Sequence, residues 1–390
     1  MIPFNQAYEI IMENAAGVAT ENVDIAQALN RVLAKDVRAD RAMPAFYKSA
    51  VDGYACYNPK GDQKLELLET IAAGVKPQFQ ITPGTCSKIM TGAEVPEGAN
   101  WVVMVEYTEV TEDGKIYIKK PGQKSNIAKK GEDFQQEDLI LDKGTILQPQ
   151  HIAILAAVGE HTPLVSAFPA VNIIATGDEL VEPSMLPTPN QIRNSNASQL
   201  RSQLQKMHIF ADYSGIVKDN RIKLQEVLSH SLQHYHITLI TGGVSMGDYD
   251  YVPSILEHAG VEVLFHKIAM KPGKPTLFGK RRDHFVFGLP GNPVSAFLQF
   301  ELLVKPLIYR MMGGFFSPVI IKLALGEDIW IKSSSRDTWK PVKIKDGKIF
   351  MLDYHGSGHI HAIHQADGFI CIPAGGQGFQ KGAYADVRQI

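Results

Sequence analysis

The sequence predicts a multidomain α/β protein whose central part is a doubly wound α/β domain. Between about residue 170 and residue 312, apolar runs of strand length alternate with amphipathic segments, as in a mostly parallel sheet covered by helices. Residues 64–147 and the residues after Pro318 instead contain short apolar runs separated by turn residues. We therefore expect a β-rich inserted domain, an N-terminal helical and elongated region, and a small C-terminal β-barrel-like domain.

Length and composition exclude several classes of protein. At 390 residues the chain is expected to form more than one domain, and its net charge of −2 indicates no nucleic-acid partner. No apolar run is long enough to span a membrane, and the first residues carry no basic stretch followed by an apolar core, so we expect no secretory signal. Cys56, Cys86 and Cys371 lie far apart in no metal or disulfide motif, which favours a reducing, cytoplasmic location.

The predicted N-terminal region comprises residues 1–42 and 139–168. Apolar spacing indicates a helix over residues 5–19, a second short amphipathic segment over 22–33, and a helix over 149–158. The inserted domain is expected at residues 43–138, with strands at 65–71, 86–90, 101–109 and 116–118 and a hairpin at Asp113-Gly114.

The α/β domain is expected at residues 169–317 and the C-terminal β domain at 318–390. In the α/β domain, strands are predicted at 171–176, 209–217, 237–241 and 285–289, and helices at 196–208, 222–233, 251–258 and 294–312. Asn196 and Asp219 occupy expected helix caps. The last domain has expected strands at 320–325, 340–344, 349–352 and 368–372, with a hairpin at Asp346-Gly347.

Three loops of the α/β domain follow the carboxyl ends of predicted strands, where ligands bind in open α/β sheets. They are Thr176-Gly177-Asp178-Glu179, Thr241-Gly242-Gly243 and Pro290-Gly291-Asn292-Pro293. Glycines allow backbone N–H groups to approach an anion, and Ser245 adds a hydroxyl donor. Asp248 and Asp250 suit a metal ion, so the loop is consistent with a phosphate bridged by Mg²⁺. The alternative is an ordinary strand–helix connection with an acidic helix start.

Lysines add positive charge close to these loops in the sequence. Lys267, Lys271 and Lys274 precede another predicted strand. They could hold a phosphate as point charges, or they could form a solvated basic turn. Acids and lysines in one crevice favour a phosphorylated, metal-assisted ligand, which the residues alone do not name.

Seven motifs, in order along nearly the whole chain, resemble those of the MoeA family of molybdopterin molybdenumtransferases, which is related to the E domain of gephyrin. They are SAVDGYA (49–55), IMTGA (89–93), GED (131–133), TGDEL (176–180), TGGVS (241–245), KPGKP (271–275) and LPGNP (289–293). The resemblance implies an elongated homodimer with four subdomains per chain. It also implies a reaction in which adenylylated molybdopterin and molybdate are substrates, Mg²⁺ assists, AMP is released and molybdenum is inserted. Expected partners are the molybdopterin adenylyltransferase and molybdoenzyme-maturation proteins.

The resemblance also implies roles for individual residues. Those expected to act in the reaction are Asp52, Thr91, Asp133, Glu179, Asp219, Asp250, Lys267 and Lys271. Glu179, Asp219 and Asp250 would lie on the metal and pterin-phosphate side, with Glu179 and Asp250 as metal ligands. Lys267 and Lys271 would neutralise phosphate or molybdate, and Asp52, Thr91 and Asp133 would reach the partner subunit's crevice. Expected substrate-binding residues are Thr176, Gly177, Gly242, Gly243, Ser245, Lys274, Pro290, Gly291, Asn292, Pro293, Arg336 and Ser357.

The C-terminal domain departs from the family at one point. His359, His361 and His364 replace a run that is usually small and hydroxyl-rich, and His355 lies just before them. On a strand, His359 and His361 would share a face, so the histidines either bind zinc or form an ordinary polar surface.

The sequence also allows two other functions. One is molybdopterin adenylyltransferase, whose loop usually reads Thr-Gly-Gly-Thr-Gly, whereas this chain has Thr-Gly-Gly-Val-Ser at 241–245 and flanking β domains. The other is a non-catalytic scaffold of the same fold, which would not need the acids and lysines. We expect no fused adenylyltransferase domain. Molybdate and tungstate share shape and charge, so either could be the oxyanion.

Overall fold

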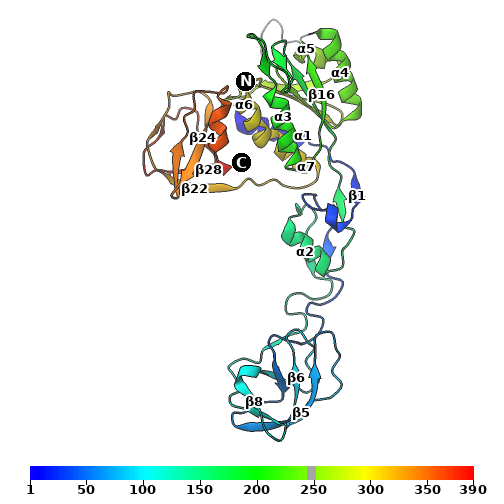
Figure 1. The fold of residues 1–390 in the computed structure, drawn as a ribbon. Helices are drawn as coiled ribbons and strands as arrows, with labels where there is room; N and C mark the ends of the chain where they lie inside the picture. Colours follow the sequence, from blue (N-terminus) through cyan, green and yellow to red (C-terminus); the bar gives the residue numbers. More distant parts are fainter. Residues whose placement is uncertain (219, 244–251) are drawn as a thin grey trace. The chain divides into compact units, whose positions relative to one another are not determined.

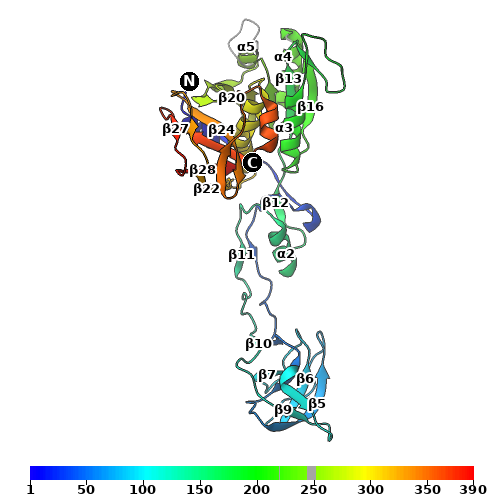
Figure 2. The ribbon, with the colours of Figure 1, turned by 60° about the vertical axis from the view of Figure 1, so that its left-hand side comes forward.

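The computed structural model describes residues 1–218, 220–243 and 252–390 (Figures 1 and 2). They form two compact units, one of residues 1–35, 143–149 and 162–390 and one of residues 36–142 and 150–161. Each unit has its own buried apolar clusters. The finer division into four subdomains stays a prediction.

The first unit contains the predicted doubly wound domain around a six-stranded sheet, in the order β16-β13-β17-β21-β20-β18. Four strands are parallel, namely β16 (Asp212–Val217), β13 (Val171–Thr176), β17 (Ile237–Thr241) and β21 (His284–Leu289). The edge strands β20 (Pro275–Arg281) and β18 (Glu262–Lys267) are antiparallel. The mostly parallel sheet is confirmed, and its antiparallel edge was not predicted.

Helices cover both faces of this sheet, so its central strands are buried throughout. Ile173, Leu239 and Phe287 pack into one cluster, whereas the alternate residues Ile174 and Ile240 pack into the other. The first cluster includes residues of α1 (Phe4–Asn14), α3 (Ser195–Gln205), α6 (Pro293–Gln299) and α7 (Lys305–Met311). The second includes residues of α4 (Arg221–His234) and α5 (Val252–His258).

The N-terminal segment departs from its predicted helical pattern. The first helix ends at Asn14, and residues 22–33 contain a single 3₁₀ turn, Ile25–Gln27, capped by Asp24. Strand pairing replaces helix here, because β1 (Thr20–Asn22) pairs with β12 (Leu164–Ser166). Long-range pairing therefore overrides the local apolar spacing.

The cap residues also differ from the predicted ones. Asn194, not Asn196, caps α3, because its side chain accepts a hydrogen bond from the N–H of Ala197. Asn220 caps α4 in the same way, accepting from Lys223. Asp219, the predicted cap, lies outside the described residues.

The C-terminal strands close into a small barrel, as predicted. Strands pair in the order β24-β25-β22-β28-β26, and β26 pairs back with β24. Their bounds are β22 (Ile320–Leu325), β24 (Asp337–Lys345), β25 (Lys348–Met351), β26 (Gly368–Ile372) and β28 (Tyr384–Gln389). The predicted hairpin at Asp346-Gly347 joins β24 to β25, and both residues have the positive φ that a tight hairpin turn requires.

A short strand from the α/β domain extends this barrel. β19 (Met270–Lys271) pairs in parallel with the start of β24, so that Lys271 lies opposite Thr338. The remaining two-stranded ladders of the unit are β23 (Ile329–Trp330) with β27 (Gly378–Phe379) and β14 (Leu180–Val181) with β15 (Ile192–Arg193). The pairing of β19 with β24 places lysines of one domain beside residues of the other.

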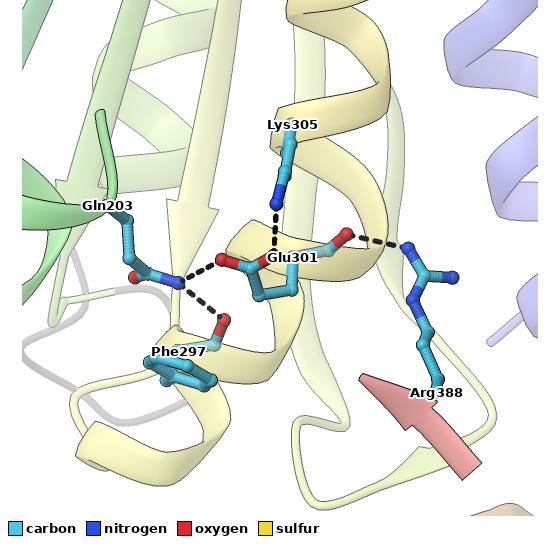
Figure 3. Close-up of polar contacts among 5 residues, drawn as sticks. All are labelled: Gln203, Phe297, Glu301, Lys305 and Arg388. Atoms are coloured by element: carbon cyan, nitrogen blue, oxygen red, sulfur yellow. Dashed lines mark hydrogen bonds and ion pairs between the residues drawn. The ribbon is translucent and has the colours of Figure 1, made fainter. Parts of the chain in front are cut away.

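A buried polar network also joins the barrel to the α/β domain (Figure 3). The predicted long helix contains a π-helical segment, Phe300–Val304, which carries the buried Glu301. Gln203 Nε2 and Lys305 Nζ each lie 2.9 Å from its carboxylate. The guanidinium of Arg388 in β28 donates to its backbone oxygen at 2.9 Å. Each of these buried charges has polar partners, which offset the cost of burying it. The hydrogen bond from Arg388 crosses from the barrel to the α/β domain, so the network fixes how the two domains pack.

The second unit contains the β-rich domain around a six-stranded sheet, in the order β7-β4-β6-β5-β9-β8. Its strands are β4 (Gly53–Cys56), β5 (Gln63–Ile71), β6 (Thr85–Ile89), β7 (Trp101–Met104), β8 (Thr108–Val110) and β9 (Ile116–Ile118). The single strand predicted at 101–109 is divided by a 3₁₀ turn, Val105–Tyr107.

The rest of the second unit is two short ladders and a helix. The ladders pair β2 (Val37–Arg38) with β11 (Leu139–Leu141) and β3 (Lys48–Ser49) with β10 (Ile127–Ala128). The predicted helix is α2 (Pro149–Ala157). Within the described ranges, no helix is both long and apolar enough to cross a membrane.

Between the central sheet and α4, a chain of buried hydrogen bonds ends at His284. Asn172 Nδ2 donates to Ser231 Oγ at 3.0 Å, and Ser231 Oγ lies 2.6 Å from Thr238 Oγ1. Thr238 Oγ1 lies 2.9 Å from Nε2 of His284, whose Nδ1 meets the backbone oxygen of Tyr235. Nδ1 must donate to that oxygen, so a neutral ring leaves Nε2 to accept. Burial lowers the pKa of His284 to about 4.

This histidine should make the first unit sensitive to acid. The pKa of His284 is about 4 in the folded chain and near 6.5 in the unfolded chain. The contribution of its neutral ring to the free energy of unfolding is therefore complete above pH ~6.5 and is lost as the pH falls toward 4. The full loss is about 3 kcal/mol. Chemical unfolding followed between pH 7 and 4 should show a flatter pH dependence for His284→Gln than for wild type, whereas the exposed His258→Gln should follow wild type. Parallel curves for His284→Gln and wild type would contradict this assignment.

Candidate functional site

Three strand ends of the central sheet lie at the same level. Ala175 pairs with Thr241, and Thr241 pairs with Leu289, so the loops that follow β13, β17 and β21 leave the sheet side by side. Together they line a pocket of about 620 Å³, which we call the strand-end pocket. The predicted convergence of the three loops is therefore confirmed. Its predicted lining residues are Thr176, Glu179, Gly242, Gly243, Pro290, Gly291, Asn292 and Pro293.

Close backbone approach explains why glycine follows β17. Gly242 has φ of +88°, and its N–H donates to the carbonyl of Leu289 at 3.2 Å. A Cβ at this position would lie 2.2 Å from the backbone oxygen of Thr176. Any side chain would therefore push the first and second loops apart. Gly177, in the first loop, would likewise bring a Cβ within 2.6 Å of the carboxylate of Glu179.

The third loop connects the strand-end pocket to the barrel. Asn196 Nδ2 donates to the backbone oxygen of Gly291 at 2.8 Å, which ties the loop to α3. Asn292 Nδ2 donates to the hydroxyl oxygen of Ser357 at 2.8 Å, and the N–H of Val294 donates to the backbone oxygen of Ser357. These bonds hold a barrel loop against the sheet edge.

A second pocket, which we call the basic pocket, lies between this loop and the barrel. It has a volume of about 410 Å³ and shares Pro275, Pro290 and Asn292 with the strand-end pocket. Its charged lining residues include Lys271, Lys274, Arg336 and Lys340, and Ser357 lies among them. In the part of the chain that the structure describes, no carboxylate is within ion-pair distance of these four cations.

The positive charge of this pocket is only partly solvated. Burial, and then the charge of Lys271, lower the pKa of Lys340 below its ordinary value. The ammonium of Lys340 lies 5.1 Å from the ring centre of Tyr354, and burial raises the pKa of that phenol to about 12. Unbalanced cations around a cavity favour binding of an anion. The basic pocket therefore suits a small, highly charged oxyanion.

The structure brings most of the predicted binding residues to these two pockets. Glu179 is exposed in the strand-end pocket, while Lys271, Lys274, Arg336 and Ser357 line the basic pocket. Lys267, at the end of β18, is not among the residues that line either pocket, and its backbone oxygen accepts from the N–H of Ile2. Asp219, Ser245 and Asp250 lie outside the described residues.

Three predicted residues belong to the second unit. The backbone N–H and the hydroxyl of Thr91 donate to one carboxylate oxygen of Asp52 at 2.7 and 2.8 Å. These bonds lower the pKa of Asp52 and keep its exposed carboxylate ionised, and the bond from the backbone N–H has the larger effect. Asp133 is exposed in the same unit, and its N–H donates to the backbone oxygen of Met43.

Glu179 is compatible with a divalent cation. No group of three or more His, Cys, Asp or Glu side chains among the residues described could hold a metal ion by itself. Mg²⁺, however, is usually held by one or two carboxylates together with substrate phosphates. An exposed carboxylate in a pocket lined by glycine loops and threonine fits that pattern.

The histidine run does not lie on a strand, which corrects that interpretation. Residues Ile360–Gln365 form a 3₁₀ helix, so His359 and His361 do not alternate on one face. The rings of His355 and His359 stack with centres 5.1 Å apart. Of the four histidines, His355 lines the basic pocket.

Sequence reasoning missed Lys340 and Tyr354. Thr338 and Lys340 share one face of β24 because strand residues alternate, and Arg336 lies two residues earlier. This spacing was a usable signal. The spacing points to Lys340 only in combination with the pairing of β19 with β24, which brings Lys271 beside the same face of the strand.

Three family models together match most of the chain. The MoeA N-terminal region (domain I and II) matches residues 2–159, a probable molybdopterin binding domain matches 172–310, and the MoeA C-terminal region (domain IV) matches 325–390.

Similar proteins were found in sequence and in structure. Molybdopterin molybdenumtransferase of Bacillus subtilis (strain 168) is 34% identical and covers 100% of the chain and 94% of the relative. The protein of that name from Staphylococcus aureus (strain Mu50 / ATCC 700699) is 33% identical and covers 99% of the chain and 95% of the relative. The molybdopterin biosynthesis moeA protein of Pyrococcus horikoshii OT3 matches in structure with a TM-score of 0.86 at 30% identity, covering 100% of both chains.

A methyl group at residue 242 should disrupt the strand-end pocket. Gly242 and Gly215 both have positive φ, but a Cβ at Gly215 would meet nothing within 4 Å. Gly215→Ala should therefore cost only the backbone strain, about 1–2 kcal/mol. Gly242→Ala should lower the melting temperature of the first unit clearly more, because its Cβ must displace the Thr176 carbonyl. Equal shifts in thermal unfolding for the two variants would contradict the close approach.

Proposed function

The chain belongs to the MoeA family, and from this we propose that it is a molybdopterin molybdenumtransferase of molybdenum cofactor biosynthesis. It inserts molybdenum from molybdate into adenylylated molybdopterin, and hydrolysis of the pyrophosphate bond releases AMP. The observation that carries this proposal is the pair of adjoining pockets, one lined by glycine loops and one by cations that have no carboxylate partner among the described residues.

The strand-end pocket would hold the phosphorylated pterin. Thr176, Thr241 and the glycines of its loops line one sheet edge, and hydroxyl and backbone N–H groups of such residues are suitable donors for a pyrophosphate. The Asn292 side chain lies where the two pockets meet, so it can orient a substrate that extends from one into the other. Such fixed donors offset the charge that develops when the phosphoanhydride is broken.

The basic pocket would hold molybdate as a substrate. Lys271, Lys274 and Arg336 supply positive charge, and the hydroxyl of Ser357 supplies a donor or acceptor. The shared wall of the two pockets would bring the oxyanion next to the pterin, which is the arrangement that transfer of the metal requires.

Magnesium would be held by Glu179 and, on the family resemblance, by Asp250. When bound, Mg²⁺ would reduce the repulsion between the phosphates and these carboxylates. Glu179 lines the strand-end pocket and is exposed, so its carboxylate can hold the ion or a water molecule.

We also propose a homodimer with shared active sites. The hydrogen bonds from Thr91, and to a smaller extent the charge of Lys88, keep the exposed carboxylate of Asp52 ionised. The family resemblance assigns Asp52, Thr91 and Asp133 to the crevice of the partner subunit. In this proposal each site combines acids from one subunit with pockets from the other.

The substrate of the reaction must be made by adenylyl transfer to molybdopterin. We therefore propose the molybdopterin adenylyltransferase as the supplying partner and molybdoenzyme-maturation proteins as receivers. The cytoplasmic location stays a prediction.

Release of AMP from adenylylated molybdopterin tests the proposal. With Mg²⁺, wild type should release AMP when molybdate is added and much less without it. Glu179→Gln should reduce the rate at least tenfold, because the variant loses the charge that holds the metal. Glu226→Gln, an exposed acid on α4, should keep the wild-type rate.

Other results would favour the alternatives. Net formation of adenylylated molybdopterin from ATP would identify an adenylyltransferase. Absence of AMP release with either molybdate or tungstate would favour a non-catalytic scaffold.

Mixing two impaired variants tests the shared site. Asp52→Ala and Glu179→Gln should each retain a tenth of the wild-type rate or less when expressed alone. Co-expression should restore about a quarter of wild-type AMP release, because half of randomly assembled dimers contain one intact site. If both residues act within one subunit, the mixture should stay at a tenth of the wild-type rate or less.

A further inference from the structure

We propose that Lys340, held by Tyr354, makes the basic pocket select doubly charged over singly charged tetrahedral oxyanions. This inference rests on the proposed function, since it concerns the pocket assigned to molybdate. It adds a specificity-determining residue that neither the sequence motifs nor the family resemblance indicated.

The position of Lys340 follows from strand geometry. β24 runs along the pocket, and Thr338 and Lys340 lie on the same face because strand residues alternate. β19 pairs with the start of this strand and places Lys271 opposite Thr338. Two lysines on neighbouring strands therefore line one cavity of about 410 Å³.

Tyr354 restricts the Lys340 side chain without neutralising it. The ammonium lies 5.1 Å from the ring centre, where the face of an aromatic ring attracts a cation. Burial raises the pKa of the phenol to about 12, so the ring supplies no negative charge near neutral pH. The cation is thus oriented and still free to bind an anion.

The groups facing Lys340 come from several elements, and those described are cationic or neutral. Lys271 lies on β19, Lys274 on the following loop, Arg336 just before β24, and His355 on the loop after Tyr354. Asp353 is largely exposed, and its carboxylate pairs with His355 at 3.0 Å instead of with Lys340.

This arrangement selects an anion by its charge as well as by its shape. Two ammonium groups that line one cavity repel each other, and an anion between them replaces that repulsion with attraction. The attraction doubles when the anion carries two charges instead of one. Arg336 and Ser357 can recognise the oxygens of either anion, so removal of Lys340 should reduce the preference for charge more than the recognition of shape.

The pH dependence has a definite direction. Burial and Lys271 lower the pKa of Lys340 in the free protein, and a bound dianion would raise it again. Affinity for the dianion should therefore fall as the pH rises through the free-state pKa of Lys340. This step should disappear when Lys340 cannot titrate.

Calorimetric binding of tungstate and perrhenate to the full-length chain tests the proposal. Both anions are tetrahedral and similar in size, but perrhenate carries one charge and tungstate carries two. Wild type should bind tungstate more tightly. Lys340→Met should weaken tungstate binding about tenfold or more, the amount expected for one charged hydrogen bond, and should change perrhenate binding much less.

Two variants serve as controls. Lys340→Arg should restore most of the tungstate preference, which a purely structural loss would not allow. Lys343→Met, at an exposed position of the same strand, should bind both anions as wild type does. The pH dependence of tungstate binding should be flatter in Lys340→Met and in Lys340→Arg, neither of which has a titrating amine at this position, than in Lys343→Met.

Equal weakening of tungstate and perrhenate in Lys340→Met, or unchanged binding of both, would overturn the proposal. Absence of tungstate binding to wild type would overturn it together with the oxyanion pocket. If wild type shows the Lys340-dependent preference but releases no AMP, the inference stands and the proposed function fails.

Discussion

The site depends on the alignment of three parallel strands whose ends lie at one level. Because Ala175, Thr241 and Leu289 are in register, the loops after β13, β17 and β21 must leave the sheet together. They can do so only if the second loop carries no side chain at Gly242, where a Cβ would meet the Thr176 carbonyl. Close packing of backbone against backbone thus creates a pocket lined by peptide groups, which is the chemistry that phosphate recognition requires.

The second constraint is electrostatic and involves two domains. The pairing of β19 with β24 and the buried Glu301 network hold the barrel against the α/β domain (Figure 3). In that network, charges are buried with partners and contribute to a defined packing. In the basic pocket, by contrast, described cations lie together without a carboxylate. Among the described residues, this contrast supports our proposal that the basic pocket binds an anionic substrate.

The sequence predicted the parallel strands and the converging loops because strands buried on both faces form continuous apolar runs ending in glycine. It failed where pairing between distant residues decides the structure. Residues 22–33 are amphipathic, yet β1 pairs with β12, and His361 and His364 lie in a 3₁₀ helix instead of a strand. Lys340 was missed for the same reason, since only the pairing of β19 with β24 brings Lys271 to its strand. Motif resemblance supplied Arg336 and Ser357, which spacing alone would not have identified.

The position of a bound oxyanion tests whether the basic pocket is the molybdate site. Crystals of the full-length chain soaked in tungstate would show the metal by anomalous scattering. We expect a peak in the basic pocket, within contact distance of Lys271, Arg336 and Ser357 and next to Asn292. A peak that lies elsewhere in the chain, with the basic pocket empty of tungstate, would contradict the assignment of the two pockets.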